Sequence, residues 1–276
     1  MREGVIVSRL AKRFHDLKAR DEKALICFVT AGDPSPEHTV EIVGTLARAG
    51  ADAVEIGLPF SDPLADGPSI QASSQRSLER GMTTAKALDI VRQVRASNPD
   101  LPLILMTYYN PIRHYGLERY AQHAAAAGAD AHIVTDLTPE EAVEWKSCSA
   151  AAGLDTVFLL APTSTRTRIE VVGKLSTGFV YCVSRTGVTG ARQDVPAELT
   201  GFVEMIREYT PVPVCVGFGI STPDHVRRIC AFADGAVVGS SLVDLIHHNR
   251  DNQDLLPTVY DYVSALKAGT KAQPAS

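Results

Sequence analysis

The sequence predicts a single (β/α)8 barrel with one extra helix before the first strand. Eight short apolar segments alternate with stretches that have the composition and the caps of helices. Because strand and helix alternate throughout, with no run of consecutive strands, the pattern favours a parallel sheet. Eight such units within about 250 residues fit a closed barrel better than an open sheet.

The eight predicted strands are runs of Val, Ile, Leu and aromatic residues, several of them almost unbroken. Such runs are typical of parallel strands that are covered on both faces. They lie at residues 24–31, 52–58, 101–109, 130–137, 155–162, 178–183, 212–219 and 234–241.

Helix signals fill the segments between the strands. Pro36 suits the first turn of a helix, Thr83 suits an N-cap, and Thr138 with Glu141 reads as a capping box. The predicted helices span 36–50, 83–98, 117–127, 138–153, 165–175, 196–209, 223–232 and 255–267, with a short helix after Gly239 and the extra one at 5–18. We expect residues 1–268 to form one domain and 269–276 to form a disordered tail.

Composition narrows the class of protein further. The 276 residues include 27 basic and 32 acidic side chains, a net charge of −5 that argues against binding to nucleic acid or to an anionic membrane. Five cysteines without C-x-x-C spacing, three of them in strand segments (Cys27, Cys182 and Cys215), indicate buried reduced thiols. With neither a signal-peptide pattern nor a long apolar run, the sequence predicts a cytoplasmic protein.

Glu55 is the first candidate catalytic residue, because it places a charged side chain within a predicted apolar strand. Strand alternation groups Ala53, Glu55 and Gly57 on one side and the aliphatic Val54 and Ile56 on the other. The aliphatic pair suits the helix-covered outside, so Glu55 is expected inside the barrel near its upper rim. A desolvated glutamate there would have a raised pKa and would exchange protons near neutral pH. A structural glutamate paired with an arginine is the alternative.

The segment 58–71 follows this strand and reads as a loop too long for a plain connector. It carries Asp62, Asp66 and three prolines that stiffen it. Asp66 is a candidate acceptor for a substrate N–H or hydroxyl, and a solvated turn with aspartate caps is the alternative.

Two further regions follow later strands. The loop 184–196 contains Gly187 and Gly190, which suit a mobile lid, and Tyr181 in the strand before it is either a proton relay or a core phenol. Gly-rich turns then follow the last two strands, at 217–221 and at 239–241. In barrels these two turns often hold phosphate through backbone N–H groups, so a phosphate site is expected there without any basic side chain.

Other chemistries find little support in the sequence. His247 and His248 are adjacent, a poor spacing for metal ligands on one helical face, so no metal site is expected. There is no nucleophile elbow, and neither Lys23 nor Lys174 follows a strand end in the way that a Schiff-base lysine would.

Taken together, these residues resemble the tryptophan synthase alpha subunit family over nearly the whole chain. The segments that carry the resemblance are FVTAGDPSPE (28–37), VEIGLPFSDPLADGPSIQ (54–71), MTYYNPI (106–112), FLLAPTST (158–165), GFVYCVSRTGVTGAR (178–192), VCVGFGIS (214–221) and DGAVVGSSLV (234–243). The strings PFSDPLADGP and SRTGVTG are very specific to that family.

The resemblance implies a lyase of tryptophan biosynthesis that cleaves indole-3-glycerol phosphate to indole and glyceraldehyde 3-phosphate. Glu55 matches the acid/base glutamate of the family, and Asp66 matches the aspartate that stabilises the indole N–H. Substrate contacts carry over to Phe28, Met106, Tyr108, Tyr181, Thr189, Gly190, Gly219, Gly239 and Ser240. No metal and no cofactor are implied in this subunit.

The resemblance also implies a partner, a pyridoxal-phosphate beta subunit in an αββα heterotetramer that receives indole through a tunnel. The segments 58–71, 110–111 and 136–141 would form the contact face, although Thr138 and Pro139 depart from the usual family pattern. Three alternatives remain at this point: a stand-alone indole-3-glycerol phosphate lyase, another phosphate-binding barrel such as a sugar-phosphate isomerase, and a catalytically silent regulatory subunit.

Overall fold

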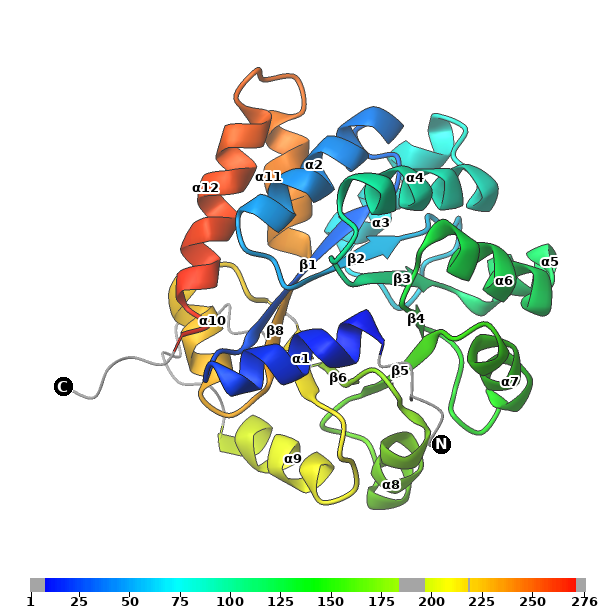
Figure 1. Ribbon diagram of the computed structural model, residues 1–276, viewed down its shortest axis with the longest axis vertical. Coiled ribbons are helices and arrows are strands. Elements are labelled where there is room, and N and C mark those ends of the chain that lie inside the picture. The colour runs from blue at the N-terminus through cyan, green and yellow to red at the C-terminus, as the bar shows by residue number, and fades with distance from the viewer. Residues whose placement is uncertain (1–7, 184–196, 218, 272–276) are drawn as a thin grey trace, which may run out of the picture.

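Eight parallel strands form a closed barrel in the order β1 to β8 (Figure 1). The computed structural model describes residues 8–183, 197–217 and 219–271. The strands are β1 Ala24–Thr30, β2 Ala53–Gly57, β3 Leu103–Thr107, β4 Ala131–Val134, β5 Asp155–Leu160, β6 Val180–Val183, β7 Val214–Gly217 and β8 Gly235–Val238. The predicted (β/α)8 barrel is therefore confirmed.

One helix of the outer ring follows each strand. These helices are α2 Pro36–Arg48, α4 Thr84–Ser97, α6 Leu117–Ala127, α7 Val143–Ala151, α8 Arg166–Leu175, α9 Ala197–Arg207, α10 Pro223–Cys230 and α12 Leu255–Ala268. Their starts follow local chemistry: the hydroxyl of Thr83 accepts from the N–H of Lys86, and the hydroxyl of Thr165 accepts from the N–H of Arg168.

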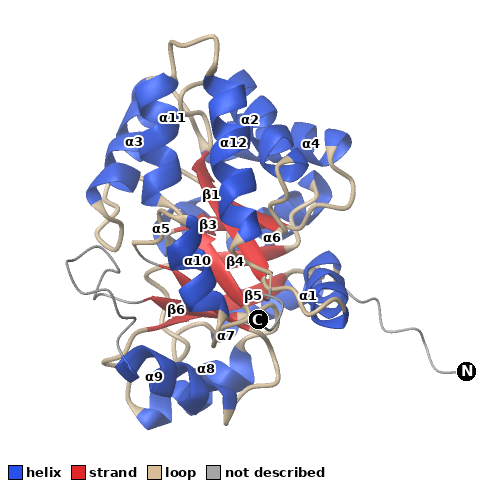
Figure 2. Ribbon diagram, turned by 90° about the vertical axis from the view of Figure 1, so that its left-hand side faces the viewer, coloured by secondary structure: helices blue, strands red, loops and turns tan. Residues whose placement is uncertain are grey.

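Four further helices are additional to the eight of the outer ring: α1 Arg9–Ala19, α3 Pro68–Glu79, α5 Tyr109–Tyr115 and α11 Ser240–Asn249. The predicted N-terminal helix and the short helix after Gly239 are thus confirmed. The prediction missed α3 and α5, and the expected loop 58–71 loses its last four residues to a helix that starts at Pro68. Figure 2 shows α1 and α3 on opposite sides of the barrel.

The start of α7 was predicted wrongly. Thr138 and Glu141 do not form a capping box, because the N–H of Glu141 bonds to the carbonyl of Thr138, and that of Ala142 to the carbonyl of Pro139. These two bonds make successive tight turns, so the helix begins only at Val143 and has no side-chain N-cap.

Side-chain alternation separates two apolar layers. Ile26, Ala53, Ile104 and Val237 belong to a cluster inside the barrel, whereas Cys27 belongs to the larger layer between strands and helices. All five cysteines are free thiols, as expected; Cys27, Cys182 and Cys215 lie in strands β1, β6 and β7.

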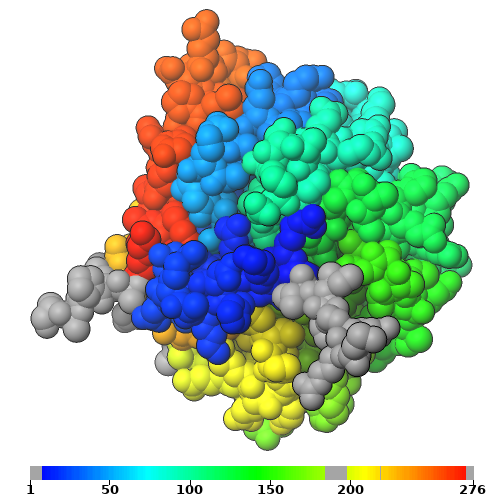
Figure 3. Space-filling view, viewed as in Figure 1, coloured from blue at the N-terminus to red at the C-terminus, as the bar shows by residue number. Residues whose placement is uncertain are grey.

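Helix α1 covers the end of the barrel at which the strands begin. Leu10 and Leu17 are buried in the interior cluster, and α1 forms the blue patch across the centre of the face in Figure 3. Arg9 forms an ion pair of 2.9 Å with Asp130, and the hydroxyl of Ser8 donates to Asp155 at 2.6 Å. Both apolar burial and polar contacts therefore hold this helix in place.

Three aspartates at this end link neighbouring strands. Asp52, Asp130 and Asp234 each stand just before a strand and accept a backbone N–H from the first or second residue of an adjacent strand, at 2.8, 2.8 and 2.9 Å. Each also pairs with a basic side chain: Lys267 at 2.6 Å, Arg95 at 2.6 Å and Arg207 at 2.9 Å, in that order. The aspartates of the repeated Ala-Asp and Asp-Gly pairs in the sequence thus link neighbouring strands, and we call these three residues the strand clamps.

The chain end differs in part from the expected tail. Thr270 is buried, and Lys271 forms a β-bridge with Glu22, so residues 269–271 contact the barrel. Residues 272–276 lie outside the described part of the chain. The proposal of one domain over 1–268 stays a prediction.

Candidate active site

Glu55 lies inside the barrel on β2, beside Phe28 of β1 in the register of the sheet. Its neighbours alternate as the sequence suggested, since Ala53 belongs to the interior cluster and Val54 and Ile56 to the outer layer. The side chain is only 1% exposed, and its Oε1 atom has no hydrogen-bond partner in the described structure. Burial raises the pKa of Glu55 to about 8. A carboxyl group with this pKa is mostly protonated at neutral pH.

Asp66 lies in the segment between β2 and α3 and is half-buried. Burial raises its pKa to about 6, and a hydrogen bond from Tyr108 partly offsets that rise. The hydroxyl of Tyr108 also accepts the N–H of Ala65 at 3.0 Å, and its ring packs against that of Phe60, tilted by 33°, with centroids 5.1 Å apart. Tyr108, which directly follows β3, therefore holds the segment that carries Asp66.

Tyr181 on β6 links the two carboxyl groups electrostatically. Its pKa is raised well above the usual value, first by burial and then by the nearby charges of Glu55, Cys215 and Asp66. Its ring lies against Gly217 of β7, where any side chain would collide with the phenol. Residues from β2, β6 and the segment after β2 thus surround one region at the carboxyl ends of the strands.

Two of the other predicted substrate residues lie on the neighbouring strands. The ring of Phe28 is 3% exposed and lies against Gly57, which leaves no room there for a side chain. Met106 on β3 is half-buried and packs against the interior cluster, as Tyr181 does. The apolar part of the site therefore comes from β1 and β3.

A cavity of about 270 Å³ lies at the ends of β7 and β8. Gly219, Gly239 and Ser240 line it, together with Tyr181, so the two Gly-rich turns do meet as the sequence predicted. Ser240 is the first residue of α11, whose N-terminus presents free N–H groups and the positive end of the helix dipole. Such a cavity suits a phosphate group.

The cavity also has walls that the sequence did not predict: Ile70, Val183, Val237 and Asp244. Ile220, Ser221 and Ser241 also line it, and they belong to the two predicted turns, 217–221 and 239–241. The four unpredicted residues come from α3, β6, β8 and α11, and no local motif marks them.

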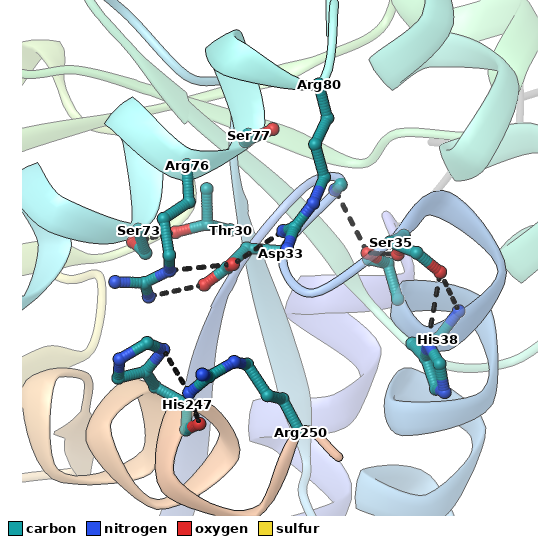
Figure 4. Close-up of polar contacts among 12 residues, drawn as sticks. Thr30, Asp33, Ser35, His38, Ser73, Arg76, Ser77, Arg80, His247 and Arg250 are labelled. Atoms are coloured by element: carbon teal, nitrogen blue, oxygen red, sulfur yellow. Dashed lines mark hydrogen bonds and ion pairs between the residues drawn. The ribbon is translucent and has the colours of Figure 1, made fainter.

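Helix α3 is fixed to β1 by a polar cluster (Figure 4). Asp33, in the loop after β1, accepts two hydrogen bonds from Arg76, at 3.0 and 2.6 Å, and is also approached by Arg80 at 3.5 Å. The hydroxyls of Thr30 and Ser73 lie 2.6 Å apart and join β1 to the same helix. These contacts set the position of α3, and with it the position of Ile70 in the cavity.

Two predicted site residues, Thr189 and Gly190, belong to the segment 184–196 outside the described residues. Among the residues that the structure describes, no group of three or more His, Cys, Asp and Glu side chains could hold a metal ion. The described helices also include none with the length and apolarity needed to cross a membrane.

The fold and the site together define a class of protein. A closed (β/α)8 barrel with two carboxyl groups of raised pKa at the carboxyl ends of its strands is a barrel enzyme suited to proton transfer.

Comparison with known proteins gives the family. A model of the tryptophan synthase alpha chain family matches residues 14–271. The tryptophan synthase alpha chain of Geobacter sulfurreducens is 51% identical over 95% of this chain and 98% of its own length. That of Solibacter usitatus is 46% identical over 97% of this chain and its own full length.

Solved structures agree. The alpha subunit of tryptophan synthase from Legionella pneumophila superposes with a TM-score of 0.89 at 36% identity, covering 95% of this chain and 98% of that one. A chain from tryptophan synthase of M. tuberculosis gives 0.87 at 31% identity, covering 97% and 100%. The chain belongs to the tryptophan synthase alpha chain family.

Proposed function

We propose that this chain cleaves indole-3-glycerol phosphate to indole and glyceraldehyde 3-phosphate, as the alpha subunit of a tryptophan synthase. Membership of the family supports the activity. The observation that carries the mechanism is Glu55, a buried carboxyl group with a pKa of about 8 inside an enzyme barrel.

Glu55 is the proposed acid and base. Breaking the carbon–carbon bond requires a proton on C3 of the indole and removal of the proton from the side-chain hydroxyl. A carboxyl group that is protonated at neutral pH gives its proton to C3, and the resulting carboxylate then accepts the hydroxyl proton. The glutamate returns to its initial state at the end of the step.

Asp66 and the cavity serve the two ends of the substrate. With a pKa of about 6, Asp66 is mostly ionised near pH 7, and its carboxylate would accept the indole N–H and stabilise the positive charge that develops on the ring. The cavity at the start of α11 would hold the phosphate through backbone N–H groups. Phe28, Met106 and Tyr108 would contact the indole.

The proposed partner is a beta subunit that carries the pyridoxal phosphate, in an αββα assembly. On the expected contact face, Leu64 is 92% exposed and Val143, just beyond 136–141, is 77% exposed. Large exposed apolar side chains of this kind are typical of protein interfaces. No cofactor is proposed for this chain itself.

The experiment that tests the function is an indole-release assay with indole-3-glycerol phosphate and a Glu55→Gln variant. We expect the variant to lose at least about 10²-fold in kcat while still binding the substrate, because the amide cannot donate or accept the proton. Near-normal turnover in the variant would remove Glu55 from the mechanism. Added beta subunit should raise the rate, which a stand-alone lyase would not show.

A further inference from the structure

The cavity proposed for the phosphate is lined in part by a carboxylate, that of Asp244. Among its described lining residues, Asp244 is the one with a charged side chain, and its charge is negative. An anion site usually places donors or cations around its ligand, so a carboxylate in this position opposes binding.

Helix geometry places this carboxylate close to the proposed phosphate position. Asp244 lies four residues after Ser240 on α11, so the two side chains share one face of the helix. Side chains with this spacing are about 6 Å apart at their Cβ atoms. A phosphate bound at Ser240 would therefore lie within about one helical turn of the carboxylate.

A second helix keeps the carboxylate in place. The hydroxyl of Ser69, one residue into α3, donates to Oδ2 of Asp244 at 2.9 Å. In the described part of the chain, no lysine, arginine or histidine forms an ion pair with Asp244. Its charge is thus held by a neutral donor and is not neutralised by a cation.

We propose that Asp244 is a specificity-determining residue that weakens the hold of the site on the phosphate group. The inference rests on the proposed function, because it requires the phosphate to bind at the start of α11. Backbone N–H groups and the helix dipole attract the phosphate, and the fixed carboxylate repels it. The balance limits how long a phosphorylated product stays bound, and it disfavours ligands with more negative charge than one phosphate group.

The test is a comparison of phosphate affinity between the wild-type chain and Asp244→Asn. Asparagine has nearly the same shape and still accepts the hydrogen bond from Ser69, so only the charge is removed. Dissociation constants for inorganic phosphate and for glycerol 3-phosphate are measured by calorimetry at low ionic strength. We expect binding to tighten by about tenfold in the variant, and the gain to shrink at high salt because salt screens the repulsion.

Asp251→Asn is the matched control. Asp251 follows α11, its side chain is 86% exposed, and its substitution changes the net charge by the same amount without touching the cavity. Its effect on both dissociation constants should stay below twofold. Asp244→Ser removes the same charge and provides a second variant in case Asp244→Asn folds poorly.

The outcomes separate the two proposals. Unchanged or weaker phosphate binding in the folded Asp244 variants, or an equal gain in Asp251→Asn, would overturn the role of Asp244 and leave the proposed function intact. A wild-type chain that binds neither phosphate ligand would overturn the phosphate site itself, and the role of Asp244 with it.

Discussion

A single buried carboxyl group, that of Glu55, links the chemistry of this chain to its stability. Its pKa is about 8 in the folded chain, against an ordinary value of about 4.3 in an unfolded one. The folded state therefore binds the proton more tightly. Its stabilising effect is complete below about pH 4 and is lost as the pH rises through about 8.

This linkage gives a prediction for Glu55→Gln in the absence of substrate. The amide is neutral at every pH, so the free energy of unfolding of the variant, relative to wild type, should increase by about 4 kcal/mol between pH 5 and pH 8.5. Urea unfolding at the two pH values measures it. Glu204→Gln, on an exposed position of α9, should show no such pH-dependent difference. A constant difference for Glu55→Gln would mean that Glu55 ionises normally.

Asp66 should act in its ionised form, so activity should fall as the pH drops through about 6. For Asp66→Asn we expect kcat to fall by about 10²-fold, because the developing positive charge loses its carboxylate, with a smaller change in KM. The acidic limb of the pH profile should also disappear. A variant with unchanged kcat would exclude this role, and one that retains the limb would assign it to another group.

At the scale of elements, sequence patterns predicted those helices and strands that follow simple rules. The eight strands were found because each is apolar on both faces, and the cap at Thr83 was found because hydroxyl caps act locally. Helix α3 was missed because its buried positions include Ser73, Ser74 and Ser77, whose face is not apolar in the sequence.

The residues of the candidate site, like the helices, were predicted only where a local sequence pattern marked them. Glu55 stood out because a charge in an apolar strand is unusual, and the Gly-rich turns stood out through their place after the last two strands. Asp244 was not predicted, because its importance comes from the packing of α11 on α3, which brings Ser69 within 2.9 Å. Contacts between distant segments leave no local pattern.

The ion pair between Asp33 and Arg76 is predicted to keep α3, and with it one wall of the phosphate cavity, in position. Asp33→Asn weakens the bidentate contact with Arg76, whose side chain is only 21% exposed, so we expect a loss of about 2 kcal/mol in the free energy of unfolding. KM should rise more than kcat falls, since α3 forms one wall of the phosphate cavity. Asp89→Asn, which alters an exposed pair on α4, is the control for stability and should change it by less than about 0.5 kcal/mol. An unchanged KM would show that α3 is held by its other contacts.

At the scale of the whole molecule, the barrel separates two tasks between its ends. The strand clamps and α1 lie where the strands begin, and the carboxyl groups and the cavity lie where they end. This division is usual for such barrels, in which the loops after the strands vary with the chemistry. Substitutions at the first end should therefore affect stability more than catalysis.

Asp130→Asn tests this separation. Asp130 accepts the N–H of Leu103 and pairs with Arg95 and Arg9, so its loss of charge should cost about 3 kcal/mol of unfolding free energy. Below the melting temperature of the variant, kcat and KM should stay within about twofold of wild type. Arg9→Gln should cost less, because that side chain is 47% exposed. A large loss of activity in fully folded Asp130→Asn protein would show that the two ends of the barrel are coupled.

The position of α1 has a practical consequence for handling the enzyme. Lys12 projects from this helix with 71% of its side chain exposed, on the end of the barrel away from Glu55 and Asp66. A dye, a surface linker or an affinity handle attached at Lys12 would leave the substrate entrance and the proposed partner face free. The molecule thus offers an anchoring point for immobilisation in which every copy presents its working end to the solution.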